Sequence, residues 1–281
     1  MIVITGATGN IGGEIARLLV AGGHPVRLFV RDSSRAPQLS GAQVMTGDLT
    51  QPATMLAAFE PGDTLFMVSV HTHNEARTAI HRGVIDAARD SGVDRIVYLS
   101  FLAASDDATN YHARSHGATE RMIVQSGILW TFLRPSLYMQ VLASRFDGGR
   151  VLRAPAGDGH ASWVSRSDVA VAAAVVLSTT GHDGRVYDIT GPESLSMGET
   201  ATVVSNVVGR EFRYIEETSN VARRLLRQTR QDEWQVEARV ASWESVRVGE
   251  VARVSDAVEH LTGRPPTSLR RYVEANINEF A

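Results

Sequence analysis

A glycine-rich stretch directly after the first apolar run constrains the fold more than any other feature of the chain. Residues 2–4 are typical of a β-strand, and Thr5-Gly6-Ala7-Thr8-Gly9-Asn10-Ile11-Gly12-Gly13 then leads into apolar residues at helical spacing. Glycines at such a junction permit a tight strand-to-helix turn and let the backbone approach a ligand. The helix start offers free N–H groups and a positive dipole end, which favour phosphate. The motif therefore predicts a dinucleotide-binding turn.

Strand-like and helix-like segments alternate through the first half of the sequence. Apolar runs at 26–30, 43–45, 64–68, 95–99 and 129–133 predict further strands, and 11–20, 74–90 and 109–125 predict helices, with a weak helix between the second and third strands. Continuously apolar strands separated by helices indicate a parallel sheet covered on both faces. We therefore expect an α/β fold built on a doubly wound parallel sheet.

The second half has a looser pattern, with glycine-rich turns around a buried helix at 169–177 and a strand at 186–190. Further helices are predicted at 197–208, 221–240 and 267–280. We expect residues 1–135 to form the dinucleotide-binding core. Residues 136–281 are expected to form mostly a smaller substrate-binding portion packed against that core.

The end of the second strand bears on the choice of dinucleotide. An arginine there pairs with the 2′-phosphate of NADP, whereas an acidic side chain binds the 2′-hydroxyl of NAD. Arg31 and Arg35 stand on either side of Asp32-Ser33-Ser34. The two guanidiniums favour NADP, while Asp32 favours NAD, and solvated surface arginines are the other interpretation. The expected cofactor is NADP (NADPH), with NAD the less favoured one.

Composition limits the chemistry and the partners that the chain can have. The formal net charge of −3 gives no electrostatic footprint for nucleic acid, and the absence of Cys excludes disulfides and thiolate catalysis. All 28 basic residues are Arg, so a lysine cannot take part in proton transfer. Apolar runs are too short for a membrane span and no targeting segment is visible. A cytoplasmic protein without membrane contact is expected.

Several motifs together resemble a known family. The glycine loop, Gly47-Asp48-Leu49, Leu133-Arg134-Pro135 and the ending Leu261-Thr262-Gly263-Arg264-Pro265-Pro266 are similar to the NmrA-like family of atypical short-chain dehydrogenase/reductases. That family includes NAD(P)H:quinone oxidoreductases and triphenylmethane reductases. The resemblance covers essentially the whole chain and implies a Rossmann-like fold with a bound dinucleotide.

The resemblance also implies which residues contact each part of the cofactor. The residues that would hold the pyrophosphate are Gly6, Thr8, Gly9, Asn10, Ile11 and Gly12. Arg31 would hold the ribose phosphate. The residues that would flank the adenine are Asp48 and Leu49. The ribose and nicotinamide side would be lined by Val68, Ser69 and Val70, and the nicotinamide would be faced by Ser100 and Phe101. His71 and His73 follow the fourth strand and are either cofactor or substrate contacts or simply loop polarity.

The proton relay of short-chain dehydrogenases uses Ser, Tyr and Lys, and here it is incomplete. Ser100 and Tyr111 could supply the first two, but Ser115 stands in the place of the Lys. An unassisted tyrosine keeps a pKa of about 10, so acid catalysis on an alcohol or ketone is poorly supported. An easily reduced acceptor needs less assistance. His116 and Tyr111 are the candidate catalytic residues, because each could give a proton or hydrogen-bond the substrate.

We therefore expect an NADP(H)-dependent oxidoreductase that transfers hydride to a quinone-like or other conjugated small molecule. The alternative is a non-catalytic NAD(P)-binding redox sensor that regulates a protein partner, which the incomplete relay fits equally well. A nucleotide-sugar epimerase or dehydratase is disfavoured, because those enzymes use the Tyr–Lys pair. A metal at His112 and His116 is disfavoured because further ligands are not apparent. The sequence leaves open whether the chain forms a homodimer.

Overall fold

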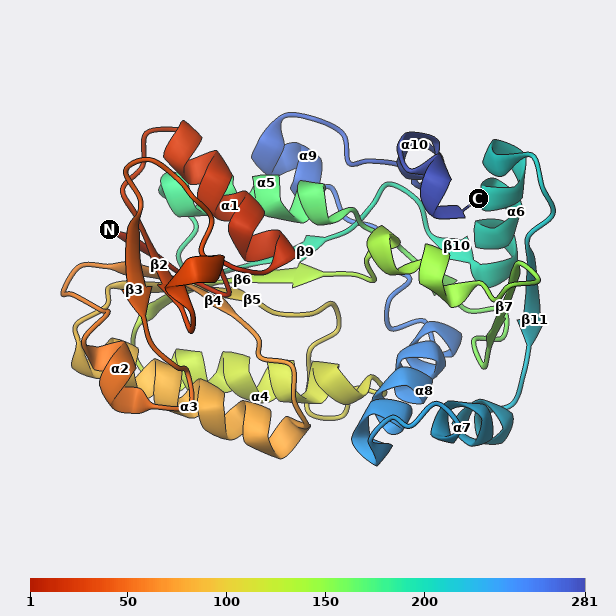
Figure 1. Ribbon diagram of the computed structural model, residues 1–281, viewed down its shortest axis with the longest axis horizontal. Helices are drawn as coiled ribbons and strands as arrows, with labels where there is room; N and C mark the ends of the chain where they lie inside the picture. Colours follow the sequence, from red (N-terminus) through yellow and green to blue (C-terminus); the bar gives the residue numbers. More distant parts are fainter. Residues whose placement is uncertain (281) are drawn as a thin grey trace. The chain divides into compact units, whose positions relative to one another are not determined.

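A parallel sheet with helices on both faces forms the centre of the fold, as predicted from the sequence. The computed structural model describes residues 1–280, and within them seven strands form one sheet in the order β3-β2-β1-β4-β5-β6-β9 (Figure 1). These strands are β1 (Ile2–Thr5), β2 (Val26–Val30), β3 (Gln43–Thr46), β4 (Thr64–Val68), β5 (Arg95–Leu99), β6 (Leu129–Pro135) and β9 (Arg185–Ile189). Neighbouring strands from β3 to β6 are parallel. The Rossmann-like α/β class is confirmed.

Helices cover both faces of this sheet (Figure 1). Helices α1 (Asn10–Ala21) and α5 (Arg166–Ser178) lie on one face, and α2 (Pro52–Leu56), α3 (Asn74–Asp90) and α4 (Tyr111–Gln125) lie on the other. Coverage on two sides buries every residue of β1 and β2. For this reason the strands read as continuous apolar runs in the sequence, and β2, β4 and β5 have the predicted bounds.

The strand order reverses beside β1. The chain moves from β1 to β2 and β3 in one direction, and then returns to the other side of β1 with β4, β5 and β6. Such a reversal leaves a crevice beyond the carboxyl ends of the adjoining strands, which is where ligands bind in open α/β sheets. The segments after β1 and β4 are therefore the places to look for a site.

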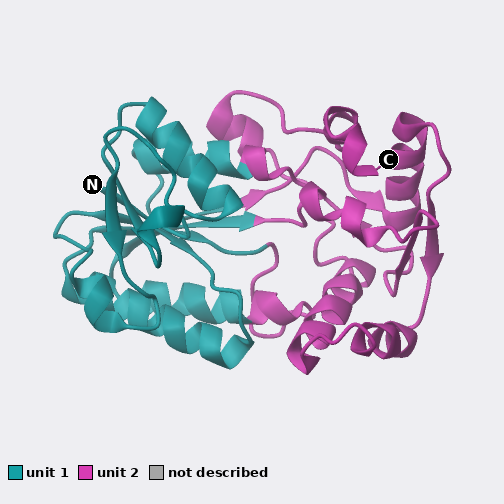
Figure 2. Ribbon diagram, viewed as in Figure 1, with its two compact units in different colours: residues 1–101, 115–134, 169–187 teal, residues 102–114, 135–168, 188–281 magenta. Residues whose placement is uncertain are grey.

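The chain divides into two compact units (Figure 2). Unit 1 comprises residues 1–101, 115–134 and 169–187, and unit 2 comprises residues 102–114, 135–168 and 188–281. This division differs from the expected boundary at 135/136. Most of α5 and the start of β9 belong to unit 1, because β9 extends its sheet next to β6.

Unit 2 contains short strands and most of the later helices. Strand β7 pairs in parallel with β11, and β8 pairs antiparallel with β10. The elements are β7 (Val151–Ala154), β8 (His160–Ala161), β10 (Leu195–Ser196), α6 (Met197–Val208), β11 (Arg213–Glu216), α7 (Ser219–Arg227), α8 (Glu233–Arg247), α9 (Ala257–Thr262) and α10 (Leu269–Ala275). Four of these strands were not predicted, because runs of two to four residues carry too little periodicity.

Three helix predictions are wrong. The single helix expected over 221–240 is two helices, α7 and α8. Between them Arg230 adopts a left-handed φ of 57°, and the Asp232 N–H then donates to the Gln235 side chain at 3.0 Å, which starts a new helix. The expected helix at 267–280 is α10 followed by the 3-10 turn Ile277–Phe280. The weak helix expected after β2 is only the 3-10 turn Ser33–Arg35.

Within unit 2, the loop before α4 is fastened to a distant part of the chain. The Asn110 side-chain carbonyl accepts the N–H groups of His112 and Ala113 at 3.0 and 3.3 Å, which caps the first turn of α4. The Glu250 carboxylate accepts the Thr109 and Asn110 N–H groups at 2.6 and 3.2 Å. A residue about 140 positions later therefore completes this helix start.

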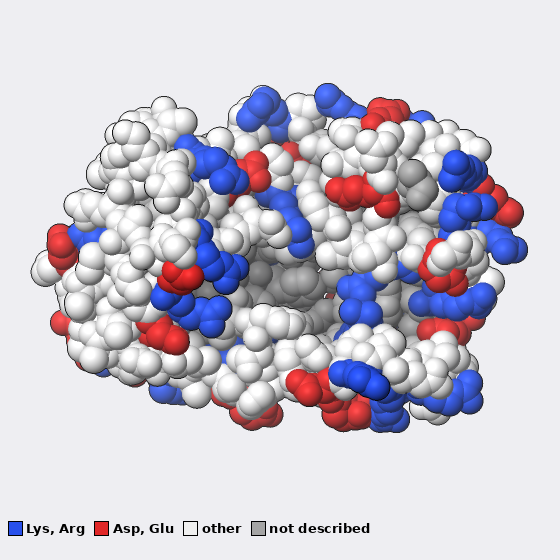
Figure 3. Space-filling model, viewed as in Figure 1, with Lys and Arg blue, Asp and Glu red and all other residues white. Residues whose placement is uncertain are grey.

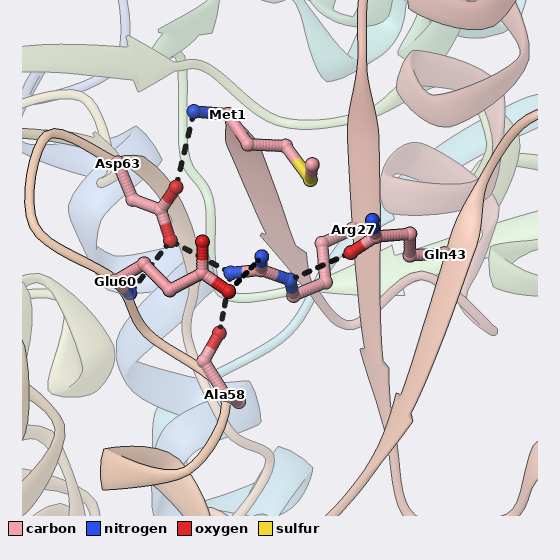
Figure 4. Close-up of polar contacts among 6 residues, drawn as sticks. All are labelled: Met1, Arg27, Gln43, Ala58, Glu60 and Asp63. Atoms are coloured by element: carbon pink, nitrogen blue, oxygen red, sulfur yellow. Dashed lines mark hydrogen bonds and ion pairs between the residues drawn. The ribbon is translucent and has the colours of Figure 1, made fainter.

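A buried ionic cluster stabilises one end of β2 (Figure 4). The Arg27 guanidinium, on a residue only 3% exposed, donates to Asp63 at 2.8 Å, to Glu60 at 2.7 Å and to the Ala58 carbonyl at 2.9 Å. The Met1 amino group lies 3.0 Å from the other oxygen of Asp63. Because a buried charge is costly without partners, this dense pairing fixes β2 against the segment before β4.

Acidic and basic side chains are interspersed over the face drawn in Figure 3. The sequence contains 28 basic and 31 acidic residues. Among residues 1–280, no helix combines the length and the apolar character needed to cross a lipid bilayer.

Candidate functional site

A cavity of about 380 Å³ lies at the carboxyl ends of β1 to β4, within unit 1. Its volume falls in the range of about 300–1,000 Å³ that is typical of small-molecule sites. It occupies the position where the strand order reverses. The lining residues are Gly6, Thr8, Phe29, Val30, Arg31, Gly47, Asp48, Leu49, Thr50, Val68, Ser69, Val70, His71, Thr72 and Ile80.

The glycine turn forms one wall of this cavity through Gly6 and Thr8. Gly6 adopts a φ of +67°, which favours glycine, and its carbonyl accepts the Gly9 N–H at 2.9 Å. A Cβ on Gly12 would lie only 2.4 Å from the Gly6 carbonyl oxygen, so α1 can start this close to β1 only with glycine there. No residue of the first turn of α1, 10–13, is acidic. The helix start therefore favours an anion, as the motif predicts.

Arg31 and Asp48 face the same cavity from the ends of β2 and β3. Hydrogen bonds from the Thr50 N–H and hydroxyl, both 2.9 Å long, lower the pKa of Asp48, and the Arg31 charge acts in the same direction. Asp48 is therefore held as a carboxylate with its orientation fixed by Thr50. Arg31 adds a guanidinium to the same wall.

Asp32, the residue that favoured NAD in the sequence, is engaged in its own turn. Its carboxylate accepts the Ser34 N–H at 2.9 Å and the Ser34 hydroxyl at 2.7 Å, and these bonds lower the pKa of Asp32. Asp32 is the N-cap of the 3-10 turn that ends at Arg35. Neither Asp32 nor Arg35 is among the lining residues.

Most residues predicted at the cofactor line the cavity. They are Gly6, Thr8, Arg31, Asp48, Leu49, Val68, Ser69 and Val70. Gly9, Asn10, Ile11 and Gly12 form the adjoining turn and the start of α1 instead. His71 is part of the lining, whereas His73 caps α3 by accepting the Ala76 N–H at 3.4 Å. The lining residues that were missed are Phe29, Val30, Gly47, Thr50, Thr72 and Ile80, and the first three adjoin strand ends that the carboxyl-end rule indicates.

Ser100 and Phe101 follow β5 and are not among the lining residues. The Ser100 hydroxyl donates to the Glu120 carboxylate at 2.5 Å, and Arg134 binds the same carboxylate through two nitrogens. Glu120 is 6% exposed, so this pair is shielded from water. The Ser100 proton is thereby committed to Glu120, which fastens the end of β5 to α4 and β6.

His116 projects from α4 toward β5, where it meets two aromatic rings. The Tyr98 hydroxyl lies 2.7 Å from the His116 Nδ1, and the Phe101 ring lies nearly parallel to the imidazole, with centroids 6.2 Å apart. His116 is 7% exposed and Tyr98 is fully buried. The sequence indicated His116 but gave no signal for Tyr98, which reads as an ordinary strand residue.

Helix α3 places a cation and a second imidazole behind the cavity wall. Arg77, 4% exposed, donates to the Ser115 hydroxyl and to the Thr72 carbonyl, both at 3.3 Å. His81 accepts the Val70 N–H at 3.4 Å through Nε2, and its Nδ1 lies 2.8 Å from the Thr119 hydroxyl. Burial lowers the pKa of His81 to about 3, and the Arg77 charge contributes, so this imidazole is neutral.

Tyr111, the other candidate acid, is the first residue of α4 and belongs to unit 2. Its ring contacts the His112 ring edge-on at 5.3 Å, and the Arg114 guanidinium lies 6.0 Å from its centroid. The His112 ring in turn lies beside the Trp234 ring, with the two ring centroids 6.2 Å apart. Across the described chain, no group of three or more His, Asp or Glu side chains is arranged to hold a metal ion.

A search of protein families matches residues 6–180 to one described as NAD(P)H-binding. The NAD(P)H azoreductase of Xenophilus azovorans is 31% identical, and the match covers 100% of this chain and 99% of that protein. An NADPH-dependent quinone oxidoreductase from Escherichia coli, solved with NADPH, has a TM-score of 0.91 at 29% identity, and the match covers 99% of this chain and 100% of that one. The Citrobacter sp. triphenylmethane reductase, solved with NADP(H), has a TM-score of 0.87 at 29% identity, and the match covers 98% of this chain and 99% of that one.

Proposed function

Because this chain belongs to the NAD(P)H-binding family, we propose that it is an NADP(H)-dependent reductase whose acceptor is a quinone-like or other conjugated small molecule. The resemblance predicted from the sequence is thereby confirmed at the level of the family. The three relatives described above are named for the reduction of an azo compound, a quinone and a triphenylmethane. These acceptors share an electron-poor conjugated system, and that common chemistry defines the substrate class proposed here.

The observation that carries the proposal is the cavity at the carboxyl ends of β1 to β4. Gly6 and Thr8 form a wall next to the amino end of α1, which suits a pyrophosphate. Asp48 and Leu49 form the wall where the adenine is expected, and Val68, Ser69 and Val70 continue along β4. The residues present therefore fit a dinucleotide. When bound in its reduced form, such a cofactor supplies a hydride.

The arrangement after β2 supports NADP(H) rather than NAD(H). A guanidinium at Arg31 can bind a 2′-phosphate through two nitrogens, and it lines the cavity. Binding of NAD would call for a carboxylate at the same place to accept a ribose hydroxyl, but Asp32 is not among the residues that line the cavity, and its Oδ1 accepts two hydrogen bonds from Ser34 in its own turn.

Steady-state kinetics with a panel of acceptors tests the proposal. The purified protein is mixed with NADPH or NADH and with a quinone, an azo dye, a triarylmethane dye and an aldehyde, and oxidation of the cofactor is followed at 340 nm. We expect turnover with at least one conjugated acceptor, a preference for NADPH, and little turnover of the aldehyde. Failure to reduce any conjugated acceptor would contradict the proposal.

A non-catalytic redox sensor is the second candidate function. The locked Ser100 and the absence of lysine favour it, because both remove parts of a proton relay. Tight NADPH binding without turnover of any acceptor, together with a partner captured only at one NADP/NADPH ratio, would favour the sensor.

A homodimer and a cytoplasmic location are further proposals. Sedimentation of the pure protein tests the first, and fractionation of cells tests the second.

A further inference from the structure

A phenol and an imidazole are paired inside unit 1, close to the end of β5. The Tyr98 hydroxyl and the His116 Nδ1 are 2.7 Å apart, and the centroids of the two rings are 5.6 Å apart. Tyr98 is fully buried, so water does not compete for its hydroxyl. The bond therefore fixes one ring nitrogen of His116 and the orientation of the ring.

Tyr98 remains a neutral phenol in these surroundings. Burial raises the pKa of Tyr98 well above its ordinary value, and the Thr119 and Ser69 hydroxyls and the Arg77 guanidinium only partly offset that effect. Glu120 raises it further, and the neighbouring His81 carries no charge. A neutral hydroxyl can either donate or accept a hydrogen bond.

This property lets Tyr98 hold His116 in both of its protonation states. In the resting neutral imidazole, the Tyr98 hydroxyl donates to Nδ1, and the ring proton is placed on Nε2. When the imidazole is protonated, its Nδ1–H donates to the Tyr98 oxygen. In both states Nδ1 is held by the phenol, so Nε2 is the atom from which a proton can be given up.

The position of His116 agrees with a part in the reaction. Phe101 lies against the imidazole at the end of β5, and ligands of parallel sheets bind beyond such strand ends. Ser100, the neighbouring hydroxyl, is committed to Glu120. The sequence also contains no lysine to serve as an acid.

We propose that His116 gives the proton that completes the reduction of a quinone, and that Tyr98 is the positioning residue that orients it. This inference rests on the proposed function. A quinone that accepts a hydride gains two electrons and becomes a hydroquinone anion. The donor is the protonated imidazole: its Nε2–H bond breaks, an O–H bond forms on that anion, and the neutral imidazole that remains keeps its Nδ1–H on the Tyr98 oxygen until Nε2 regains a proton from water.

Two acceptors distinguish an effect on proton transfer from an effect on hydride transfer. A quinone needs both, as described above. A triarylmethane dye is a carbocation, so a hydride at its central carbon gives a neutral product, and no proton is consumed. A residue that only donates the proton therefore affects the ratio of quinone to dye reduction, whereas a residue that supports cofactor binding or folding affects both reactions together.

The test compares wild type with His116→Gln and Tyr98→Phe. Proton donation by a positioned side chain contributes about 10²–10⁴-fold, so we expect His116→Gln to lower the ratio of quinone to dye kcat by that order. Tyr98→Phe should lower the same ratio by a smaller factor and shift the pH dependence of quinone kcat. Added imidazole should restore part of the quinone rate in His116→Gly, which guards against loss through misfolding.

A readout without cofactor or acceptor examines Tyr98 directly. Nitrogen chemical shifts of the His116 ring should report protonation on Nε2 in wild type and a mixture of tautomers in Tyr98→Phe. Tyr187→Phe is the matched control, because its hydroxyl lies 2.9 Å from the His182 Nδ1 in a phenol–imidazole pair outside the candidate site. That variant should leave the His116 shifts unaltered.

Three results would overturn the proposal. One is a quinone-to-dye ratio that stays at the wild-type value in His116→Gln. Another is a His116 tautomer that is the same in Tyr98→Phe as in wild type. A wild-type protein that reduces no conjugated acceptor of the panel would remove the proposed function and this inference with it, whereas dye reduction with an unaltered ratio would remove the inference alone.

Discussion

At the scale of a single residue, we expect Arg31 to determine the cofactor preference. It lines the cavity beside Asp48 and lies where a 2′-phosphate is expected. Hydrogen bonds to charged groups contribute about 1.5–3 kcal/mol, so Arg31→Gln should weaken NADPH binding about 10- to 150-fold and leave NADH binding nearly unaltered. Calorimetric titration with both cofactors measures this. Arg35→Gln is the comparison, and an equal loss in both variants would contradict the assignment to Arg31.

His81 makes the stability of the protein depend on pH. Its pKa is lowered from 6.5 to about 3 by burial, so the unfolded chain binds a proton below pH 6.5 while the folded protein does not. Stability is therefore complete above pH 6.5 and falls as the pH decreases toward 3. Between pH 7 and 5 wild type should lose about 2 kcal/mol more than His81→Asn, at about 1.4 kcal/mol per pKa unit. Urea unfolding at both pH values measures the difference, and equal losses would disprove this role.

Single residues also show what the sequence could and could not predict. Arg31 was predicted because it follows the second strand, and Asp48 and Val68 were implied by the family resemblance; all three line the cavity at the carboxyl ends of the strands. The contact between Tyr98 and His116 joins residues 18 positions apart on different elements, and Arg77 reaches Ser115 across 38 positions. No local pattern carries such pairings, because they depend on how α3 and α4 pack on the sheet.

At the scale of elements, the junction of β1 and α1 depends on Gly12. A methyl group there would lie 2.4 Å from the Gly6 carbonyl oxygen, so the helix start would have to move away from the strand. Gly12→Ala should cost about 1–3 kcal/mol of stability, as overpacking does, and weaken NADPH binding at least about tenfold. Thermal unfolding and titration measure both. Gly83→Ala in α3, where the nearest atom is 3.8 Å away, should show neither effect.

The Arg27 cluster tests how β2 is fixed to the segment before β4. Removing one partner of a buried ion pair costs about 3–5 kcal/mol, so Arg27→Met should destabilise the protein by that amount. Arg89→Met removes an exposed pair with Asp86 and should cost no more than about 1 kcal/mol. Chemical unfolding compares the two. A small loss in Arg27→Met would mean that packing, rather than charge pairing, fixes this end of the strand.

Elements were predicted well where two signals agreed. Helices α3 and α6 have the predicted bounds, since apolar periodicity and terminal turn residues indicate the same limits. The break between α7 and α8 was missed because residues 228–232 contain no Gly or Pro, although Asp232 followed by Gln235 has the spacing of a capping box. The left-handed Arg230 and the bond from Asp232 to Gln235 separate the two helices, and neither changes the apolar periodicity of the sequence.

At the scale of the whole molecule, cofactor binding should stabilise the folded chain. A ligand that binds only the folded state adds about 2.7 kcal/mol at one hundred times its Kd. NADPH should therefore raise the thermal midpoint, and NADH at the same concentration should raise it less, because Arg31 meets no phosphate. Scanning calorimetry with each cofactor measures the shifts. The family assignment would stand without them, but an unchanged midpoint with both cofactors would contradict the proposed site.

The bond between Glu250 and the start of α4 bears on how the protein is made. A ribosome releases the strands of the central sheet long before it reaches residue 250, and domains begin to fold as they emerge. The segment before α4 must therefore wait for about 140 further residues before its N–H groups find their carboxylate. During synthesis the growing chain carries an incomplete loop, and unit 2 becomes whole only after residue 250 has emerged.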